Sequence, residues 1–169
     1  AVFATNTESH KLFSKIFYEH EEEKTYWAYT PKIENWDYSE VSAPILKAEG
    51  KKGRGRALIN FREGRPALTK FKVLENFQDY SLVEAYPKTG RLHQIRIHLN
   101  VIGSPILFDK TYGEGNREVR LRDVVHSDFT LALHARTLKF LHPVTETEIS
   151  LTANLSDNFR KLTNLFKRR

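Results

Sequence analysis

Residues 86–100 read YPKTGRLHQIRIHLN, and the interpretation of the whole chain starts from this stretch. After a turn at Thr89, a candidate N-cap, the pattern becomes helical. Ile95, Leu99 and Ile102 recur at i, i+4 and i+7, which predicts one buried stripe on a short helix. The stretch therefore predicts a helix that is anchored in the core on one side.

Polar side chains crowd the start of this helix. Arg91, His93, Gln94, Arg96 and His98 fall within eight residues. An arginine next to a buried stripe needs an anionic partner, because an unpaired buried charge is very costly. The guanidinium fork suits either a phosphate or a carboxylate. A surface helix with solvated charges is the alternative, but it does not require this many histidine, glutamine and arginine side chains together.

The pattern Gly-Arg-x-His-Gln-x-Arg-x-His resembles the signature of the RluA-type pseudouridine synthases. The matching residues are Gly90, Arg91, His93, Gln94, Arg96 and His98. Further segments resemble other family motifs in the same order, namely KTYWAYT at 24–30, GSPILFDKTYG at 103–113 and LHARTLKFLHP at 133–143. Two positions depart from the usual family pattern, with Leu92 in place of a small hydroxyl residue and Ser104 in place of histidine. The similarity covers nearly the whole chain.

Length and composition favour one basic domain. The chain has 169 residues with 40% hydrophobic content, which suits a single packed core. A net charge of +6 favours a polyanionic partner, with nucleic acid ahead of an anionic membrane surface. No apolar run reaches membrane-spanning length, and the absence of cysteine agrees with a reducing compartment such as the cytoplasm. Because the sequence contains no methionine, we expect a piece of a longer protein.

The rest of the pattern predicts an α+β fold. The expected architecture is a mixed, largely antiparallel sheet flanked by helices and loops, in one domain over residues 1–169. Residues 118–128 are highly charged, so we expect an exposed excursion there. The expected helices are 8–19 and one capped by Ser156, and the expected strands are 25–30, 67–74, 80–85, 129–133, 138–141 and 148–151.

Residues 47–56, KAEGKKGRGR, form the clearest predicted loop. Lys51, Lys52, Arg54 and Arg56 lie among glycines, so this segment can bury little apolar surface. A solvated charged turn is the usual fate of such a run, and phosphate contact is about equally well supported. Both interpretations stay open.

The family resemblance implies an RNA pseudouridine synthase that isomerises specific uridines in rRNA or tRNA without a cofactor or a metal. It places Tyr26 at the active-site tyrosine and Arg96 at the arginine that holds the nucleophilic aspartate, so we expect both in one cleft. It further implies an RNA partner, no membrane association, a monomer and a cytoplasmic location. The expected RNA-binding residues are Lys24, Lys51, Lys52, Arg54, Arg56, Arg91, His93, Gln94, Leu133 and His134.

The aspartate itself is not found in the expected context. In the family it lies in a segment resembling Arg-Leu-Asp-x-x-Thr-Ser-Gly, just before a run similar to residues 1–17. Asp109 belongs instead to the loop that follows Gly103. We therefore expect this chain to be the C-terminal portion of a pseudouridine synthase catalytic domain, with an incomplete fold and no activity alone. A non-catalytic RNA-binding module is the alternative, and an unrelated nucleic-acid-binding domain is less well supported.

Overall fold

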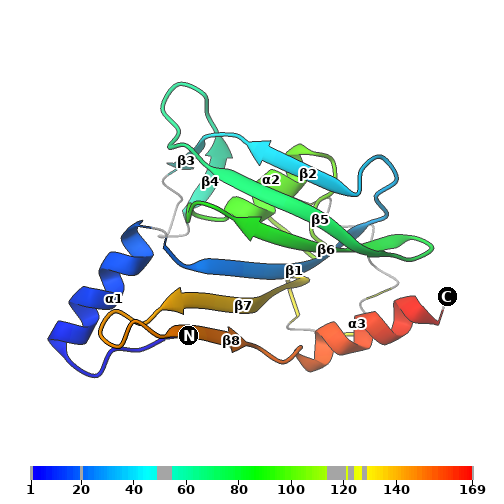
Figure 1. The fold of residues 1–169 in the computed structure, drawn as a ribbon. Helices are drawn as coiled ribbons and strands as arrows, with labels where there is room; N and C mark the ends of the chain where they lie inside the picture. The colour runs from blue at the N-terminus through cyan, green and yellow to red at the C-terminus, as the bar shows by residue number, and fades with distance from the viewer. Residues whose placement is uncertain are drawn as a thin grey trace.

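A six-stranded sheet with the order β2-β5-β6-β1-β7-β8 forms the body of the computed structural model (Figure 1). The structure describes residues 2–19, 21–48, 55–113, 121, 124–126 and 129–168. Every pairing within this sheet is antiparallel, which confirms the expected α+β class. Its strands are β1 Glu23–Pro31, β2 Tyr38–Ser42, β5 Leu68–Asn76, β6 Tyr80–Pro87, β7 Leu133–Leu141 and β8 Glu148–Thr152.

The two faces of the sheet carry different helices. Helix α2, Gln94–Val101, lies on the face of Tyr26, since both contribute to one cavity. Helix α3, Asp157–Lys167, packs on the other face, where the Tyr29 ring centroid lies 4.8 Å from that of Phe159. Alternation along β1 directs these two tyrosines to opposite faces. No helix in the described part of the chain is long and apolar enough to cross a membrane.

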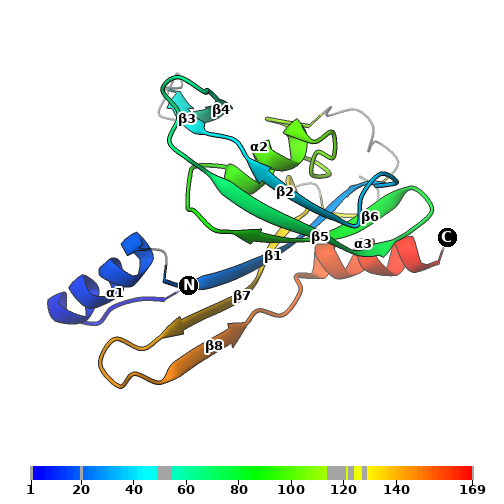
Figure 2. The same cartoon turned by 45° about the horizontal axis from the view of Figure 1, so that its top comes forward.

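Both predicted terminal helices are confirmed. Helix α1, Thr7–Glu19, lies beside the β7–β8 hairpin, where Phe13 meets Phe140 edge to face at 5.7 Å (Figure 2). Helix α3 begins after Ser156, whose Oγ accepts a hydrogen bond from the backbone N–H of Phe159. This side-chain cap satisfies one of the backbone donors that a helix start leaves open.

A second, two-stranded sheet replaces part of the predicted loop at 47–56. Strands β3, Ile45–Ala48, and β4, Arg56–Ile59, pair with each other and lie next to α2 (Figure 2). The loop prediction was wrong for the ends of this segment, because the apolar residues that flank the basic run pack together. A small core joins this sheet to α2 and contains Ile45, Ala57, Ala67 and Ile97. Lys51, Lys52 and Arg54 lie outside the described residues.

Two other expectations were wrong. Residues 129–133 and 138–141 are not separate strands, because β7 runs without a turn from Leu133 to Leu141. The register shifts around Arg136, and this bulge absorbs the residue that interrupts the alternation. Residues 118–128 were expected to be exposed, yet Leu121 and Val125 are buried in the main core. The expectation was therefore wrong at these two described positions.

Gly64, in the turn that follows β4, and Gly55, just before β4, should differ in how well they tolerate a side chain. A Cβ on Gly64 would lie 2.3 Å from the backbone oxygen of Asn60 and 2.9 Å from Pro44, so the backbone would have to shift. We expect Gly64→Ala to lower the free energy of unfolding by about 1–3 kcal/mol, measured by urea denaturation. Gly55→Ala is the control, because its Cβ would meet only ordinary contacts at 3.4 Å or more. Equal midpoints for the two variants would contradict this account.

Candidate active site

A cavity of about 320 Å³ lies between β1 and the start of α2. The structure brings Tyr26 and Arg96 to this cavity, although 70 positions separate them in the sequence. Leu131 and Leu133 supply an apolar wall, and no Asp or Glu is among the described residues that line the space. The cavity therefore combines an aromatic ring, an apolar wall and positive charge.

Arg96 is held by a buried carboxylate. Its Nε and Nη2 each donate a hydrogen bond of 2.7 Å to Asp109, and the Asp109 side chain is 1% exposed. Backbone N–H groups of Thr111 and Tyr112 also donate to Asp109 Oδ1. Burial alone would raise the pKa of Asp109, but the bonds from Arg96 and from the backbone outweigh it and lower the pKa. The sequence predicted an anionic partner for Arg96 but did not identify Asp109.

His93 occupies the N-cap position of α2, with φ 54° and ψ 22°. The expectation that Thr89 caps this helix was wrong, since the helix begins only at Gln94. His93 Nδ1 lies 3.0 Å from Tyr112 Oη, and the Arg96 guanidinium lies 5.0 Å from the Tyr112 ring centroid. Burial and the charge of Arg96 lower the pKa of His93, while Asp109 opposes that effect. At pH 7 this lowered pKa favours the neutral imidazole over the charged one.

Gln94 fixes the turn before the helix. Its Oε1 accepts from the Thr89 hydroxyl at 2.7 Å and from the Arg91 backbone N–H at 3.0 Å. Its Nε2 donates to the Leu68 carbonyl and to Thr69 Oγ1, both at 3.0 Å. These bonds use the whole hydrogen-bonding capacity of the amide. Gln94 thus positions Arg91 at the cavity rim, and the amide retains no group for an RNA contact.

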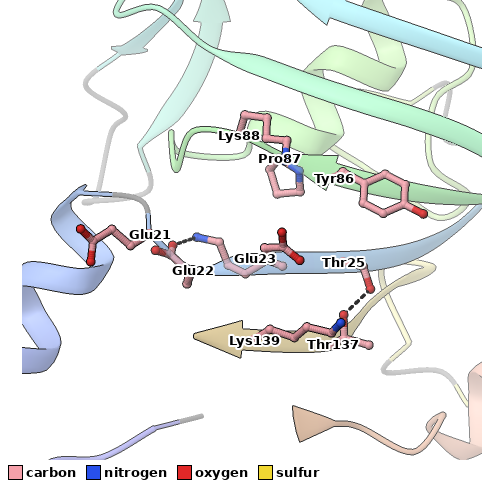
Figure 3. A pocket seen from close by; sticks show the side chains of 10 residues that line it. Glu21, Glu22, Glu23, Thr25, Tyr86, Pro87, Lys88, Thr137 and Lys139 are labelled. Atoms are coloured by element: carbon pink, nitrogen blue, oxygen red, sulfur yellow. Dashed lines mark hydrogen bonds and ion pairs between the residues drawn. The ribbon is translucent and has the colours of Figure 1, made fainter. Parts of the chain in front are cut away.

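Lys24 lines both this cavity and a second one of about 530 Å³ at the start of β1. Lys24 Nζ forms an ion pair with Glu22, whose side chain is 1% exposed. Among the described residues, Glu22 Oε2 has no hydrogen-bond partner. Figure 3 shows Glu22 in this second cavity, with Lys88 near the end of β6 and Lys139 on β7. Lys24 neutralises a buried carboxylate, and moving its charge to a phosphate would leave Glu22 unpaired.

The other residues that the sequence predicted for the site do not all lie at this cavity. Leu133 lines the cavity, whereas His134 packs against Phe159 of α3, with 5.7 Å between the ring centroids. Arg56 donates to the Thr111 carbonyl at 2.9 Å and lines a different hollow beside α2. Sequence reasoning missed Tyr112, although it lies in the quoted segment 103–113 that carries Asp109. The requirement of Arg96 for an anion was the only signal in this direction, and it did not indicate where in the chain the anion lies.

Comparison with known proteins identifies what the chain is similar to. Residues 1–101 match the family described as RNA pseudouridylate synthase. A ribosomal large subunit pseudouridine synthase C from Buchnera aphidicola (subsp. Schizaphis graminum) is 40% identical over 73% of this chain. A tRNA pseudouridine synthase C from Vibrio parahaemolyticus is 32% identical over 98% of the chain and 71% of that protein.

A solved structure supports the same fold. The human protein titled RNA Pseudouridylate Synthase Domain Containing 4 superposes with a TM-score of 0.74 at 26% identity. The match covers 96% of this chain and 69% of that one. The chain spans only 39% of the length of the Buchnera relative.

The Arg96–Asp109 pair predicts how stability depends on pH. Removing one partner of a buried ion pair leaves the other uncompensated, so Asp109→Asn should lower the free energy of unfolding at pH 7 by about 3–5 kcal/mol. Because the folded pKa of Asp109 is lowered, its contribution is complete above the unfolded pKa and disappears as the pH falls through the folded pKa. The difference from the parent protein, measured by urea denaturation, should be constant from pH 5 to 8 and shrink below about pH 4.

The control is Asp157→Asn, because Asp157 pairs with Arg160 on the surface of α3. Exposed ion pairs contribute little, so the unfolding midpoint should barely change. A loss for Asp109→Asn that is no larger than this control would show that the buried pair does not hold the site.

Proposed function

The chain belongs to the RNA pseudouridylate synthase family, and from this premise we propose that its full-length protein isomerises uridine in RNA to pseudouridine. The observation that supports this most is the cavity that unites Tyr26, Arg96 and Leu133 from three separate segments. In the family resemblance these positions correspond to the active-site tyrosine, the arginine that serves the nucleophile, and the apolar wall. The chain would be the C-terminal portion of the catalytic domain.

The reaction breaks the bond between N1 of the base and C1′ of the ribose, turns the base, and joins C5 to C1′. A proton leaves C5 and N1 gains one, so the product is an isomer and no other reactant is consumed. A carboxylate is the suitable group, as nucleophile or as base, because positive charge develops at the sugar. Arg96 would orient this carboxylate through Nη1, since Nε and Nη2 are bound to Asp109. Tyr26 would stack on the base or transfer a proton.

Asp109 is not suited to be that carboxylate. Both of its oxygens accept hydrogen bonds from Arg96, Oδ1 also accepts from backbone N–H groups, and the side chain is 1% exposed. No carboxylate is present among the described cavity residues. The reacting aspartate would therefore come from a segment upstream of Ala1, and the chain alone would be inactive. The same observation favours a second candidate, a non-catalytic RNA-binding module.

RNA is the proposed substrate, and the names of the relatives point to rRNA or tRNA. Arg91 at the cavity rim and the basic residues Lys51, Lys52, Arg54 and Arg56 would contact phosphates, while Leu133 would contact the base. We further propose a monomeric protein that acts in the cytoplasm, which agrees with the absence of cysteine.

Because no carboxylate is among the described cavity residues, we expect turnover to require the upstream segment. The chain as given should release no tritium from RNA that carries 5-tritiated uridine, and the protein extended by its natural upstream segment should release it. In the extended protein, Arg96→Lys keeps the charge beside Asp109 but loses the planar fork, so turnover should fall about a hundredfold or more. RNA affinity in a filter-binding titration should change less than about threefold, because phosphate contacts dominate it.

Arg160→Lys, at an exposed position on α3, is the matched control and should keep both turnover and affinity. Turnover by the chain without an extension would refute the proposal that the aspartate lies upstream. Full turnover by the extended Arg96→Lys variant would remove Arg96 from the active site.

A further inference from the structure

The hydroxyl of Tyr112 determines which ring nitrogen of His93 carries a proton. Tyr112 Oη accepts from the Ala57 backbone N–H at 2.8 Å, donates to the Ala57 carbonyl at 3.1 Å, and lies 3.0 Å from His93 Nδ1. A hydroxyl has one proton and two lone pairs. The proton and one lone pair serve Ala57, so the other lone pair is left to accept from His93. Nδ1 is therefore protonated and Nε2 carries the lone pair.

The opposite tautomer would leave a buried group unsatisfied. If the Tyr112 proton pointed at His93 Nδ1, the Ala57 carbonyl would lose this donor. Ala57 is only 3% exposed, and a buried carbonyl without a donor costs free energy comparable to a lost hydrogen bond. The tautomer with Nδ1–H satisfies all three partners together.

His93 faces the cavity in a conformation that requires support. A φ of 54° is uncommon outside glycine and costs of order 1–3 kcal/mol when the structure imposes it. The Tyr112 bond holds the side chain of His93, and the bond from the Arg91 backbone N–H to Gln94 Oε1 spans this position. In the described part of the chain, no hydrogen bond is made to Nε2. The strained residue thus lines the cavity of Tyr26 and Arg96 with a ring whose Nε2 is unused among these bonds.

The other charged groups at this cavity are donors. Lys24, Arg91 and Arg96 carry no acceptor, and the Tyr26 hydroxyl can serve as either. A donor such as Arg91 suits a carbonyl oxygen of uracil or the phosphate beside it, whereas Lys24 remains paired with Glu22. The N3–H group of uracil needs an acceptor, and His93 Nε2 is a neutral acceptor at the same wall. Cytosine has no proton at N3, so the same nitrogen would meet a lone pair.

We propose that His93 is a specificity residue that reads the target base, with Nε2 accepting a hydrogen bond from N3–H of uracil. This role rests on the proposed function of the cavity. Tyr112 is a positioning residue in it, because its hydroxyl selects the tautomer of His93 and ties it to β4. Uracil is favoured over cytosine because only uracil offers a proton to this nitrogen.

The proposal has a pH signature. Protonation of Nε2 turns the acceptor into a donor, so recognition is complete above the pKa of His93 and is lost as the pH falls through it. Burial and Arg96 lower this pKa below the usual 6.5, while Asp109 raises it; Tyr112, Tyr26, Lys24 and Arg91 are the other titratable or charged groups at the site. The KM for RNA should therefore rise in acid with a midpoint below 6.5, whereas kcat should change less.

The tautomer can be measured without any activity. In ¹⁵N-labelled chain at pH 7, NMR should show His93 with a protonated Nδ1 and an unprotonated Nε2, assigned by comparison with His93→Asn. Uridine 5′-monophosphate should shift the Nε2 resonance, and cytidine 5′-monophosphate at the same concentration should not. A protonated Nε2 at pH 7, or equal shifts with both nucleotides, would overturn the proposal even if the protein is a pseudouridine synthase.

Kinetics of the extended protein separate recognition from structure. His93→Asn tolerates the positive φ and keeps an amide donor near the Nδ1 position, but it has no acceptor at the Nε2 position. Its KM for RNA labelled with 5-tritiated uridine should rise about tenfold or more at pH 7, with little change in kcat and no further rise in acid. His93→Gln restores an acceptor, so its KM should recover in part but should not rise further in acid.

His10→Asn is the matched control, because His10 is exposed on α1 and is not among the residues that line the cavity. It should keep the parent KM and the parent rise of KM in acid. A parent-like KM for His93→Asn would overturn the role of His93. An extended protein with no turnover would count against the proposed function alone, since the NMR measurement tests the tautomer and the base preference independently.

Discussion

The buried ion pair between Arg96 and Asp109 is the constraint on which the site depends. It joins helix α2 to the loop at 103–113 through two hydrogen bonds of 2.7 Å. Because Asp109 is almost fully buried, neither partner can turn away without leaving an uncompensated charge. The same carboxylate accepts from the backbone of Tyr112, which places that ring beside the guanidinium and its hydroxyl beside His93 and β4. One pair thus fixes the helix, the loop and the small sheet together.

The two faces of the main sheet differ: one packs against α3 in an aromatic core, and the other carries the polar cavity. On one face the rings of Tyr29, Phe159 and Phe166 pack around α3, and the Tyr29 hydroxyl donates to Thr163 at 2.8 Å. On the other face polar side chains from α2 and β1 surround a partly open cavity. Strand β1 belongs to both, because alternation sends Tyr26 to the cavity and Tyr29 to the core. A rigid strand between the two faces keeps the tyrosine of the cavity in place.

Local patterns in the sequence predicted the elements whose structure is determined locally. The stripe of Ile95 and Leu99 and the Ser156 cap gave helices α2 and α3 because spacing and capping act within a few residues. The partner of Arg96 could not be found in this way, since it depends on the path of a loop 13 residues away. The positive φ of His93 was equally hidden, because a tertiary contact with Tyr112 supports it. The residues of the cavity came from the family resemblance rather than from periodicity.

The separate small sheet affects how freely the connection between β3 and β4 can change in length. Strands β3 and β4 pair with each other in a sheet separate from the six main strands, and Tyr112 binds the backbone of β4 through its side chain. The register of the main sheet therefore does not determine the length of the connection between β3 and β4. Insertions and deletions there can accumulate during evolution without disturbing the core. The surface beside α2 can in this way change its reach while the cavity of Tyr26 and Arg96 is kept.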